Sequence, residues 1–489
     1  MQIKINPLAH ILILSISILL SGCSQDQKNQ DSFEERIENG LRPALIYDGY
    51  YPSYNINERM QKWGVPAVSI AVIDSMKIIW VGAYGVKNIN DSIPVTTSTL
   101  FQSASVSKPV AAVGAASLAH QGLLPLDEDI NSLLEKWKID NGNFKGKVTV
   151  RKILSHSAGL GVGGFTGYWP GDSLPGLKEI INGLPPANSP AVKLVEEPDT
   201  RFIYSGGGYQ VMQMVMEDLT AKTFPEIMSE YIFDPLNMDN SFYAPLNEKQ
   251  KQNAASGHMI GEVIPGYAPV HVESAAGGLW TTPGDLALLL IELMKAYNNE
   301  SKMIFDSITA RSVFTPKFWD YGLGFKVMGE GKNFRFSHGG ATTGWHSHIM
   351  AFPERGQGVV VMTNGTNGWV LWPEIERAVA HELDWPVPVP RRTETMDVSP
   401  EKLHEYAGQY VMGNFQVDIS TDSTQLSFSG AGLDWSIVPA KVDTFEIVDM
   451  EGQVLFRRNK NNEIEGFHLW FGEPDWSPYR EWDFVKAEN

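Results

Sequence analysis

A serine and a lysine stand three residues apart in the segment Ser105-Val106-Ser107-Lys108, directly before a long apolar stretch. Residues three apart on a helix share one face, so a helix that begins here would place the Ser105 hydroxyl against the Lys108 amine. A serine is a weak nucleophile until a base takes its proton, and a lysine withdrawn from water can be that base. The spacing therefore predicts a nucleophile and its base. The alternative is a buried helix start that Ser105 merely caps.

Tyr204 is a second candidate for proton transfer, because it stands in a predicted loop just ahead of another helix. A lysine cation close to the phenol would draw the pKa of Tyr204 toward neutrality and make the phenol a base. The glycines that follow, from Gly206 to Gly208, predict a close backbone approach or a left-handed conformation. The alternative is a loop tyrosine that packs its ring and bonds a backbone group.

The segment His338-Gly339-Gly340-Ala341 is predicted to end a strand. A backbone N–H at such a strand end, together with the N–H of Ser105, can hold the negative oxygen of a tetrahedral intermediate. His338 itself can orient a substrate carboxylate, or it can be a strand-end histidine whose hydrogen bonds are satisfied locally.

Three other histidines invite catalytic or metal-binding interpretations that we do not adopt. His156 has no evident acidic partner, and its segment is typical of a packed turn. His346 and His348 alternate along one predicted strand, but a third ligand at a spacing typical of zinc is missing from the sequence. We therefore predict no metal site, and the serine chemistry requires no cofactor.

The elements that must position these residues follow from apolar periodicity and turn residues. A β-hairpin is predicted over 68–84, and Pro109 falls in the first turn of a helix that is apolar almost all round and therefore buried. The stretch 161–192, rich in Gly and Pro, predicts a long surface loop around one short helix. Helices are predicted over 109–121, 209–220, 283–297 and 371–383. Further strands are predicted over 321–328, 334–338, 345–352 and 358–364.

A proline-rich segment, Trp385-Pro-Val-Pro-Val-Pro-Arg-Arg, predicts a stiff linker and a domain boundary. Beyond it, short alternating runs with closely spaced turns predict a small antiparallel barrel. The eight runs are 406–411, 415–420, 425–429, 434–439, 444–448, 453–458, 464–470 and 480–485.

The first residues form a targeting segment: Lys4 precedes an apolar stretch, Leu8 to Leu20, that is short for a membrane span. Cys23 is the only cysteine, so no internal disulfide can form. Leu20-Ser21-Gly22-Cys23 resembles the lipobox of bacterial lipoproteins, which implies acylation of Cys23 and a membrane anchor. The alternative is an ordinary signal peptide with an unpaired thiol. We expect an exported bacterial lipoprotein, anchored in the membrane and facing the periplasm or the cell surface.

Composition sets the outer limits on fold and partners. A chain of 489 residues with 43% hydrophobic residues is expected to fold into two or three domains. Its net charge of -18 argues against a nucleic-acid partner, which would need a basic surface, and against electrostatic adhesion to anionic lipid.

The order of the motifs resembles that of the serine β-lactamase-like and penicillin-binding-protein-like hydrolases, in the branch of class C β-lactamases, esterases and D-aminopeptidases. The resemblance covers about residues 45–385. It implies an α/β (α+β) fold in which an antiparallel sheet flanked by helices lies beside an all-helical subdomain, with the site at their junction. The motifs that carry it are Phe101–Lys108, Thr149–Leu160, Tyr204–Gly206, Ala275–Thr282 and His338–Gly340.

The resemblance also implies roles for individual residues. Ser105 matches the acylated nucleophile, Lys108 its proton acceptor and Tyr204 the residue that assists proton transfer, while Ser105 and Ala341 would supply the oxyanion N–H groups. Two departures argue against efficient β-lactam hydrolysis: Gly206 replaces an asparagine, and His338-Gly339 replaces Lys-Thr in the family's Lys-Thr-Gly. The predicted substrate-binding residues are Gly206, His338, Gly339, Gly340 and an aromatic wall formed by Tyr168 and Trp169.

We therefore predict a lipid-anchored serine hydrolase that forms an acyl-enzyme with an ester or amide: a peptidoglycan-type peptide, a D-amino-acid peptide or a small ester. The alternatives are a non-catalytic lipoprotein that binds peptidoglycan or peptide, and a true β-lactamase. The predicted organisation is a signal peptide (1–22), a tether (23–44), the hydrolase domain (45–385), a linker (386–398) and an eight-stranded barrel-like domain (399–489).

Overall fold

The computed structural model describes residues 31–260, 262–266, 268–430, 432–472 and 480–487. Cys23 and the predicted signal peptide lie outside these residues. Across the described residues, every helix falls short of the length and apolar character that crossing a bilayer requires.

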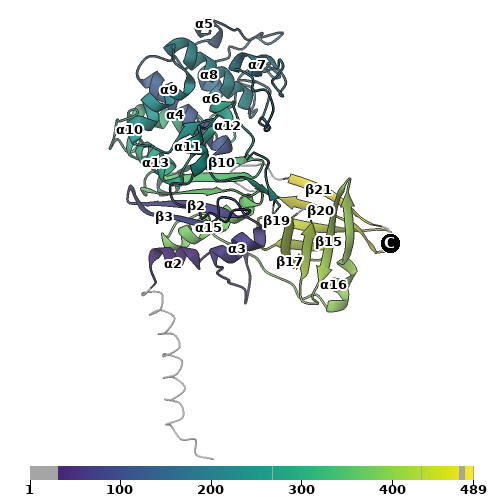
Figure 1. Ribbon diagram of the computed structural model, residues 1–489. Helices are drawn as coiled ribbons and strands as arrows, with labels where there is room; N and C mark the ends of the chain where they lie inside the picture. The colour runs from purple at the N-terminus through teal and green to yellow at the C-terminus, as the bar shows by residue number, and fades with distance from the viewer. Residues whose placement is uncertain (1–30, 261, 267, 431, 473–479, 488–489) are drawn as a thin grey trace, which may run out of the picture.

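A six-stranded antiparallel sheet, in the order β3-β2-β12-β11-β10-β9, forms the centre of the first domain (Figure 1). Alternate residues of each strand point to opposite faces, and in β2 they belong to two different cores, with Ala71 on one face and Ile70 on the other. The strands are β2 (Ala67–Asp74), β3 (Lys77–Gly85), β9 (Lys326–Met328), β10 (Arg335–Thr342), β11 (Trp345–Phe352) and β12 (Gln357–Thr363).

Helices cover both faces of this sheet. On one face lie α13 (Pro283–Tyr297) and the helical subdomain built around α4 (Ser107–His120), and on the other lie α15 (Gly368–Glu382), α3 (Ile56–Trp63) and α2 (Phe33–Glu38) (Figure 1). Residues 107–118 of α4 are all buried, as its uniformly apolar sequence predicts.

Further α-helices and minor strands complete the first domain. The remaining helices are α5 (Ile130–Leu133), α6 (Val150–Leu154), α7 (Leu177–Asn182), α8 (Gly206–Thr220), α9 (Phe224–Met228), α10 (Asp234–Leu236), α11 (Glu248–Asn253), α12 (Ser274–Gly277) and α14 (Ser307–Val313). The minor strands are β1 (Leu45–Ile46), β4 (Phe101–Gln102), β5 (Phe242–Tyr243), β6 (His258–Met259), β7 (Glu262–Val263), β8 (Leu279–Thr281) and β13 (Arg391–Arg392).

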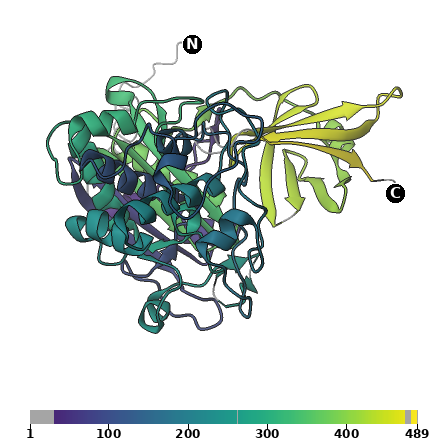
Figure 2. The ribbon, with the colours of Figure 1, turned by 90° about the horizontal axis from the view of Figure 1, so that it is seen from above.

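A closed eight-stranded antiparallel barrel forms the C-terminal domain and protrudes from one side of the first domain (Figures 1 and 2). Aromatic side chains such as Phe428, Trp435 and Phe467 fill its interior. Its strands are β14 (Gly408–Met412), β15 (Phe415–Thr421), β16 (Leu426–Gly430), β17 (Leu433–Lys441), β18 (Thr444–Ile447), β19 (Gly452–Arg458), β20 (Ile464–Phe471) and β21 (Arg480–Lys486). The predicted fold class, an α/β domain followed by a small barrel, is confirmed.

Several predicted boundaries differ from the structure. The stretch predicted as the end of a tether packs against the first domain: α2 lies there, and Ile37 and Leu41 are fully buried. The first predicted barrel strand begins too early, because Tyr406 ends the helix α16 (Pro400–Tyr406). Strand β10 continues to Thr342, so the residues from His338 to Ala341 lie within a strand instead of ending one.

Candidate active site

Ser105 lies in a 3-10 turn (Ala104–Val106) that leads directly into α4. Ala104, just before it, has φ +49, a left-handed conformation that is uncommon for a residue with a Cβ and that surrounding contacts must hold. Ser107 Oγ donates to the Ala104 carbonyl at 2.6 Å, and Ser347 Oγ of β11 donates to the Ser103 carbonyl at 2.7 Å. The Ser105 hydroxyl therefore sits on a backbone fixed from two elements, and Ser105 itself remains partly exposed.

Lys108 lies one helical turn beyond Ser105 and is only 2% exposed. Its Nζ lies 3.1 Å from Ser105 Oγ and donates to the Ala276 carbonyl, at the end of α12, at 2.8 Å. No carboxylate of the described chain pairs with this amine. Burial without a counter-charge disfavours the ammonium form and lowers the pKa of Lys108 to about 7. A large fraction of Lys108 is therefore neutral at physiological pH and able to accept a proton.

Tyr204 faces the same pair, with the Lys108 Nζ 4.9 Å from the centre of its ring. Burial raises the pKa of Tyr204 above its ordinary value, and a hydrogen bond with the Ser105 side chain lowers it to a smaller extent. The sequence-based expectation of a pKa drawn toward neutrality was wrong. The cost of burying a phenolate outweighs the gain from the hydrogen bond with Ser105. Tyr204 thus keeps its proton and is placed to donate it.

His156 packs beneath Tyr204 in the turn that follows α6. The two ring centres are 4.3 Å apart, and His156 Nδ1 accepts a hydrogen bond from the Ser205 N–H at 3.0 Å. Burial holds the pKa of His156 well below its usual value, so the ring stays neutral and remains an acceptor. This histidine fixes the backbone next to Tyr204, in agreement with its predicted structural role.

Gly340 brings strand β10 against the turn that carries Ser105. A Cβ at this position would lie 2.2 Å from the Ser103 carbonyl oxygen and 3.2 Å from the Val106 nitrogen, so only glycine permits the approach. The next residue, Ala341, is exposed and pairs in register with His346 of β11. The predicted oxyanion strand and the predicted nucleophile are therefore neighbours in space.

His338 is nearly buried, and both of its ring nitrogens have partners. Nε2 lies 2.9 Å from the Tyr321 hydroxyl, and Nδ1 lies 2.6 Å from the Gly339 carbonyl. Burial lowers the pKa of His338 to about 3, and the charge of Lys108 adds to this effect. A neutral ring with both nitrogens engaged does not supply a cation for a substrate carboxylate, so the predicted orienting role of His338 is not supported by the geometry.

Sequence reasoning missed Tyr321, which was predicted only as the start of a strand. Its hydroxyl holds His338, and its ring packs 5.0 Å from that of His156. Phe202 continues this aromatic cluster outward to Trp319, which is 73% exposed. Local spacing could not have revealed these contacts, because Tyr321 and His338 are 17 residues apart and the other ring pairs join segments more than one hundred residues apart.

The two residues predicted as an aromatic wall behave differently from each other. Tyr168 is 1% exposed, and its N–H donates to the Val270 carbonyl at 2.9 Å, so it offers no open ring face and the prediction was wrong for this residue. Trp169 is 39% exposed. Gly206 begins α8, where a Cβ would approach the Gly163 carbonyl and the Phe165 ring at 3.2 Å.

Among the described residues, no three His, Cys, Asp or Glu side chains lie together in an arrangement that could hold a metal ion. His348 instead pairs with Glu376 at 2.5 Å and stacks on Trp372, with ring centres 4.1 Å apart.

Comparison with solved structures places this arrangement in a known fold. An octameric penicillin-binding protein homologue from Pyrococcus abyssi is 19% identical and aligns with a TM-score of 0.58 over 87% of this chain and 98% of its own. SurE with D-Leu is 20% identical, with a TM-score of 0.54 over 88% of this chain and 97% of its own.

Sequence comparison finds distant relatives over the first domain. Protein flp of Staphylococcus aureus (strain MRSA252) is 21% identical over 327 residues, which is 64% of this chain and 62% of that protein. Unguisins hydrolase ungD' of Aspergillus campestris is 25% identical over 338 residues, 64% of this chain and 60% of its own. The chain thus spans about three-fifths of the length of these relatives. The model of the Beta-lactamase family matches residues 54–383, more than half of the chain. With Ser105 and Lys108 inside the matched region, this chain belongs to the Beta-lactamase family, whose members are typically serine hydrolases.

Proposed function

We propose that the protein hydrolyses an ester or amide through an acyl-enzyme on Ser105. One observation carries the proposal: a buried amine whose pKa is lowered to about 7, the Lys108 Nζ, lies 3.1 Å from the Ser105 hydroxyl. That distance is within hydrogen-bond reach, which a general base requires.

Acylation then needs one proton relay. Neutral Lys108 takes the Ser105 hydroxyl proton while Oγ attacks the substrate carbonyl carbon, and the backbone N–H groups of Ser105 and Ala341 bind the resulting oxyanion. Tyr204 donates its phenol proton to the leaving oxygen or nitrogen as the bond to the carbonyl carbon breaks. The Lys108 ammonium returns a proton to the phenolate. A water molecule then attacks the acyl-enzyme ester, with the same groups taking and returning a proton. The acyl group leaves as an acid, and Ser105 regains its hydroxyl.

The substrate class follows from what the site lacks. His338 is neutral, both of its ring nitrogens are bonded, and Gly339 carries no hydroxyl, so this strand offers no permanent cation to a carboxylate next to the scissile bond. We therefore favour a small ester, or a peptide or D-amino-acid peptide without a free carboxylate next to the scissile bond, over a β-lactam. We further propose that Cys23 is acylated and anchors an exported protein to a membrane.

Intact-mass spectrometry tests the assignment. Wild-type protein treated with a fluorophosphonate should gain one adduct on Ser105, and Ser105→Ala should gain none, whereas Ser429→Ala, on the exposed face of a barrel strand, should label like the wild type. Equal labelling of wild type and Ser105→Ala would refute the nucleophile. The same measurement with esters, D-Ala-D-Ala peptides and nitrocefin then identifies the acyl donor. A protein that binds a peptide and never forms an adduct would be the non-catalytic binder.

A further inference from the structure

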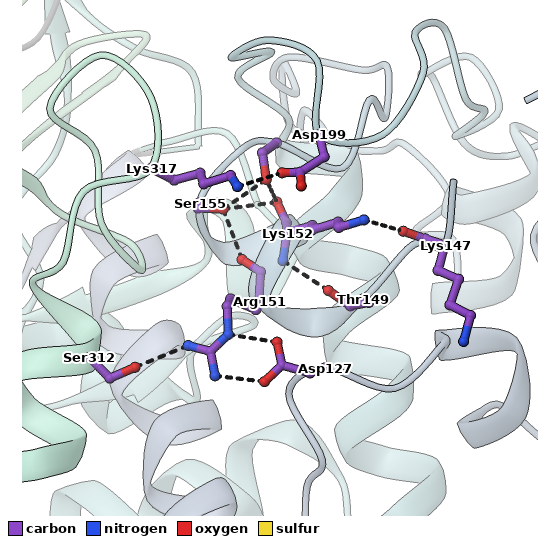
Figure 3. Close-up of polar contacts among 10 residues, drawn as sticks. Asp127, Lys147, Thr149, Arg151, Lys152, Ser155, Asp199, Ser312 and Lys317 are labelled. Atoms are coloured by element: carbon purple, nitrogen blue, oxygen red, sulfur yellow. Dashed lines mark hydrogen bonds and ion pairs between the residues drawn. The ribbon is translucent and has the colours of Figure 1, made fainter. Parts of the chain in front are cut away.

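A cavity lies between α6 and the segment that follows α14. Its volume is about 650 Å³, within the range of small-molecule sites. Eleven of the thirteen residues that line it have polar or charged side chains, and Figure 3 shows the polar contacts among most of them. Four cations, Lys147, Arg151, Lys152 and Lys317, line it together with two carboxylates, so the cavity carries a net charge of +2 in a chain whose net charge is -18.

Two of these cations lack a carboxylate partner within the described chain. Lys152 Nζ donates only to the Lys147 carbonyl, at 2.9 Å, and the Lys147 amine makes no ion pair. Arg151 and Lys317 are paired: Arg151 donates to both oxygens of Asp127 at 2.7 and 2.8 Å, and Lys317 lies 3.1 Å from Asp199. These pairs are exposed, so water screens them and a ligand can exchange with them.

Two hydroxyl groups add neutral donors to the same wall. Ser312 Oγ accepts from Arg151 Nη1 at 3.0 Å, and Thr149 Oγ1 accepts from the Lys152 N–H at 3.3 Å (Figure 3). Because both oxygens act as acceptors in these bonds, each O–H remains able to donate to a ligand. Cationic and hydroxyl donors together favour an anion, since charge-assisted hydrogen bonds to phosphate or carboxylate oxygens are the stronger ones.

The cavity is linked to the active site through its wall. Asp199 N–H donates to the Ser157 carbonyl at 2.7 Å, and the chain continues from there to Tyr204. On the other side, Lys317 N–H donates to the Tyr321 carbonyl at 2.9 Å, and the Tyr321 hydroxyl holds His338. The Lys317–Asp199 ion pair therefore joins the two segments that lead to the two active-site tyrosines.

We propose that this cavity binds a small organic anion through its phosphate or carboxylate group, and that its occupancy changes the rate of acylation by replacing Asp199 at Lys317. The proposed anion binding depends on the cavity alone. The proposed effect on the acylation rate also rests on the proposed function.

Isothermal titration calorimetry at low ionic strength tests binding. Glucose 6-phosphate and glucuronate present the two anionic groups on similar sugars, and glucose is the neutral control. At least one anionic sugar should bind saturably and glucose should not, and the sugar that binds identifies the group. Failure of both anionic sugars to bind would overturn the proposal.

Charge variants locate the site. Lys147→Gln with Lys152→Gln should weaken binding about tenfold or more. Lys460→Gln, an exposed lysine of the barrel, should leave it unchanged. Asp199→Asn removes the competing carboxylate and should tighten binding several-fold. Unchanged affinity in both pocket variants, with thermal unfolding like that of the wild type, would place the bound sugar elsewhere and overturn the site.

The fluorophosphonate labelling rate of Ser105 tests the coupling. The saturating anionic sugar should change this rate about two- to threefold or more in the wild type, and should not change it in Asp199→Asn, where the ion pair is already absent. An identical rate with and without the sugar in the wild type would overturn the coupling. If no probe labels Ser105, the proposed function fails, and the calorimetric result still decides the binding site.

Discussion

Arg59 and Lys108 are both buried cations, 6% and 2% exposed, but the chain surrounds them in opposite ways. Arg59 lies on α3 between two buried carboxylates, Glu374 of α15 and Asp449 of the barrel domain, and these partners raise its pKa above the ordinary value despite burial. Lys108 has a carbonyl and a hydroxyl as partners, and its pKa falls to about 7.

The contrast separates two consequences of burying a cation. A cation with carboxylate partners on separate elements holds those elements together, and removing it leaves uncompensated charge. A cation without carboxylates is destabilised as a charge and is therefore available as a base. If this distinction is right, variants of the two residues should separate stability from activity.

The largest expected effect is the loss of acylation in Lys108→Met. Without a base to accept the Ser105 proton, the labelling rate should fall about 10²–10⁴-fold, the range that general-base catalysis contributes. Lys108→Arg should be equally slow, because a guanidinium stays protonated at any pH where the protein is folded. Stopped-flow or intact-mass kinetics with the fluorophosphonate measure the rate. An active Lys108→Arg variant would show that Lys108 is not the base.

Arg59→Met should spare the chemistry and damage the fold. Glu374 and Asp449 would remain buried without their shared partner, which costs about 3–5 kcal/mol of unfolding free energy. Lys62→Met is the matched control: Lys62 also pairs with Asp449, at 3.1 Å, but is 28% exposed, so its loss should cost less than about 1 kcal/mol. Urea unfolding measures both values, and labelling of folded Arg59→Met should proceed at the wild-type rate. Similar costs for the two variants would contradict the contrast.

Lys108→Met should also stabilise the protein. The pKa of Lys108 is about 7 when folded and about 10.4 when unfolded, so the unfolded chain binds more protons between these values and stability rises with pH. The free-energy cost of burying the Lys108 ammonium has its full value below pH 7. Removing the amine should therefore add on the order of 2–4 kcal/mol at neutral pH, and the gain should shrink toward pH 10. Urea unfolding of variant and wild type at pH 6 and pH 9.5 gives the comparison. A gain that does not shrink would indicate better packing and no relief of charge burial.

Much of this arrangement could be predicted from the sequence, because it depends on local pattern. The buried helix after Ser105, the strands of the sheet and the eight barrel strands are all periodic apolar runs. The end of β10 was misplaced since two glycines, Gly339 and Gly340, interrupt its pattern, although Gly340 is there to let β10 approach the Ser105 turn. Residues 33–44 were predicted as tether since the segment is mostly polar, but Ile37, Leu41, Pro43 and Ala44 are buried.

The electrostatics could not be predicted in the same way. The directions of the Tyr204 and His338 pKa shifts depend on how deeply the two rings lie in the protein. The hydrogen bond to His338 Nε2 depends on Tyr321, which lies 17 residues earlier in the chain. Burial and long-range partners are properties of the packed chain. A motif identifies which groups meet, and the fold decides which of them carry protons.

The smallest expected effect is the change of the acylation rate with each pH unit. It reports most directly on the protonation of Lys108. Only neutral Lys108 accepts the Ser105 proton, so the labelling rate should fall about tenfold for each pH unit below 7 and level off above it. Tyr204, whose pKa is raised, should cause no decline before strongly alkaline pH. His338→Gln is the control, because the pKa of His338 is about 3 and its loss should leave the midpoint near 7. A midpoint that moves or vanishes in His338→Gln would assign the titration to the histidine, and a flat profile from pH 5 to 9 would mean that Lys108 does not titrate during acylation.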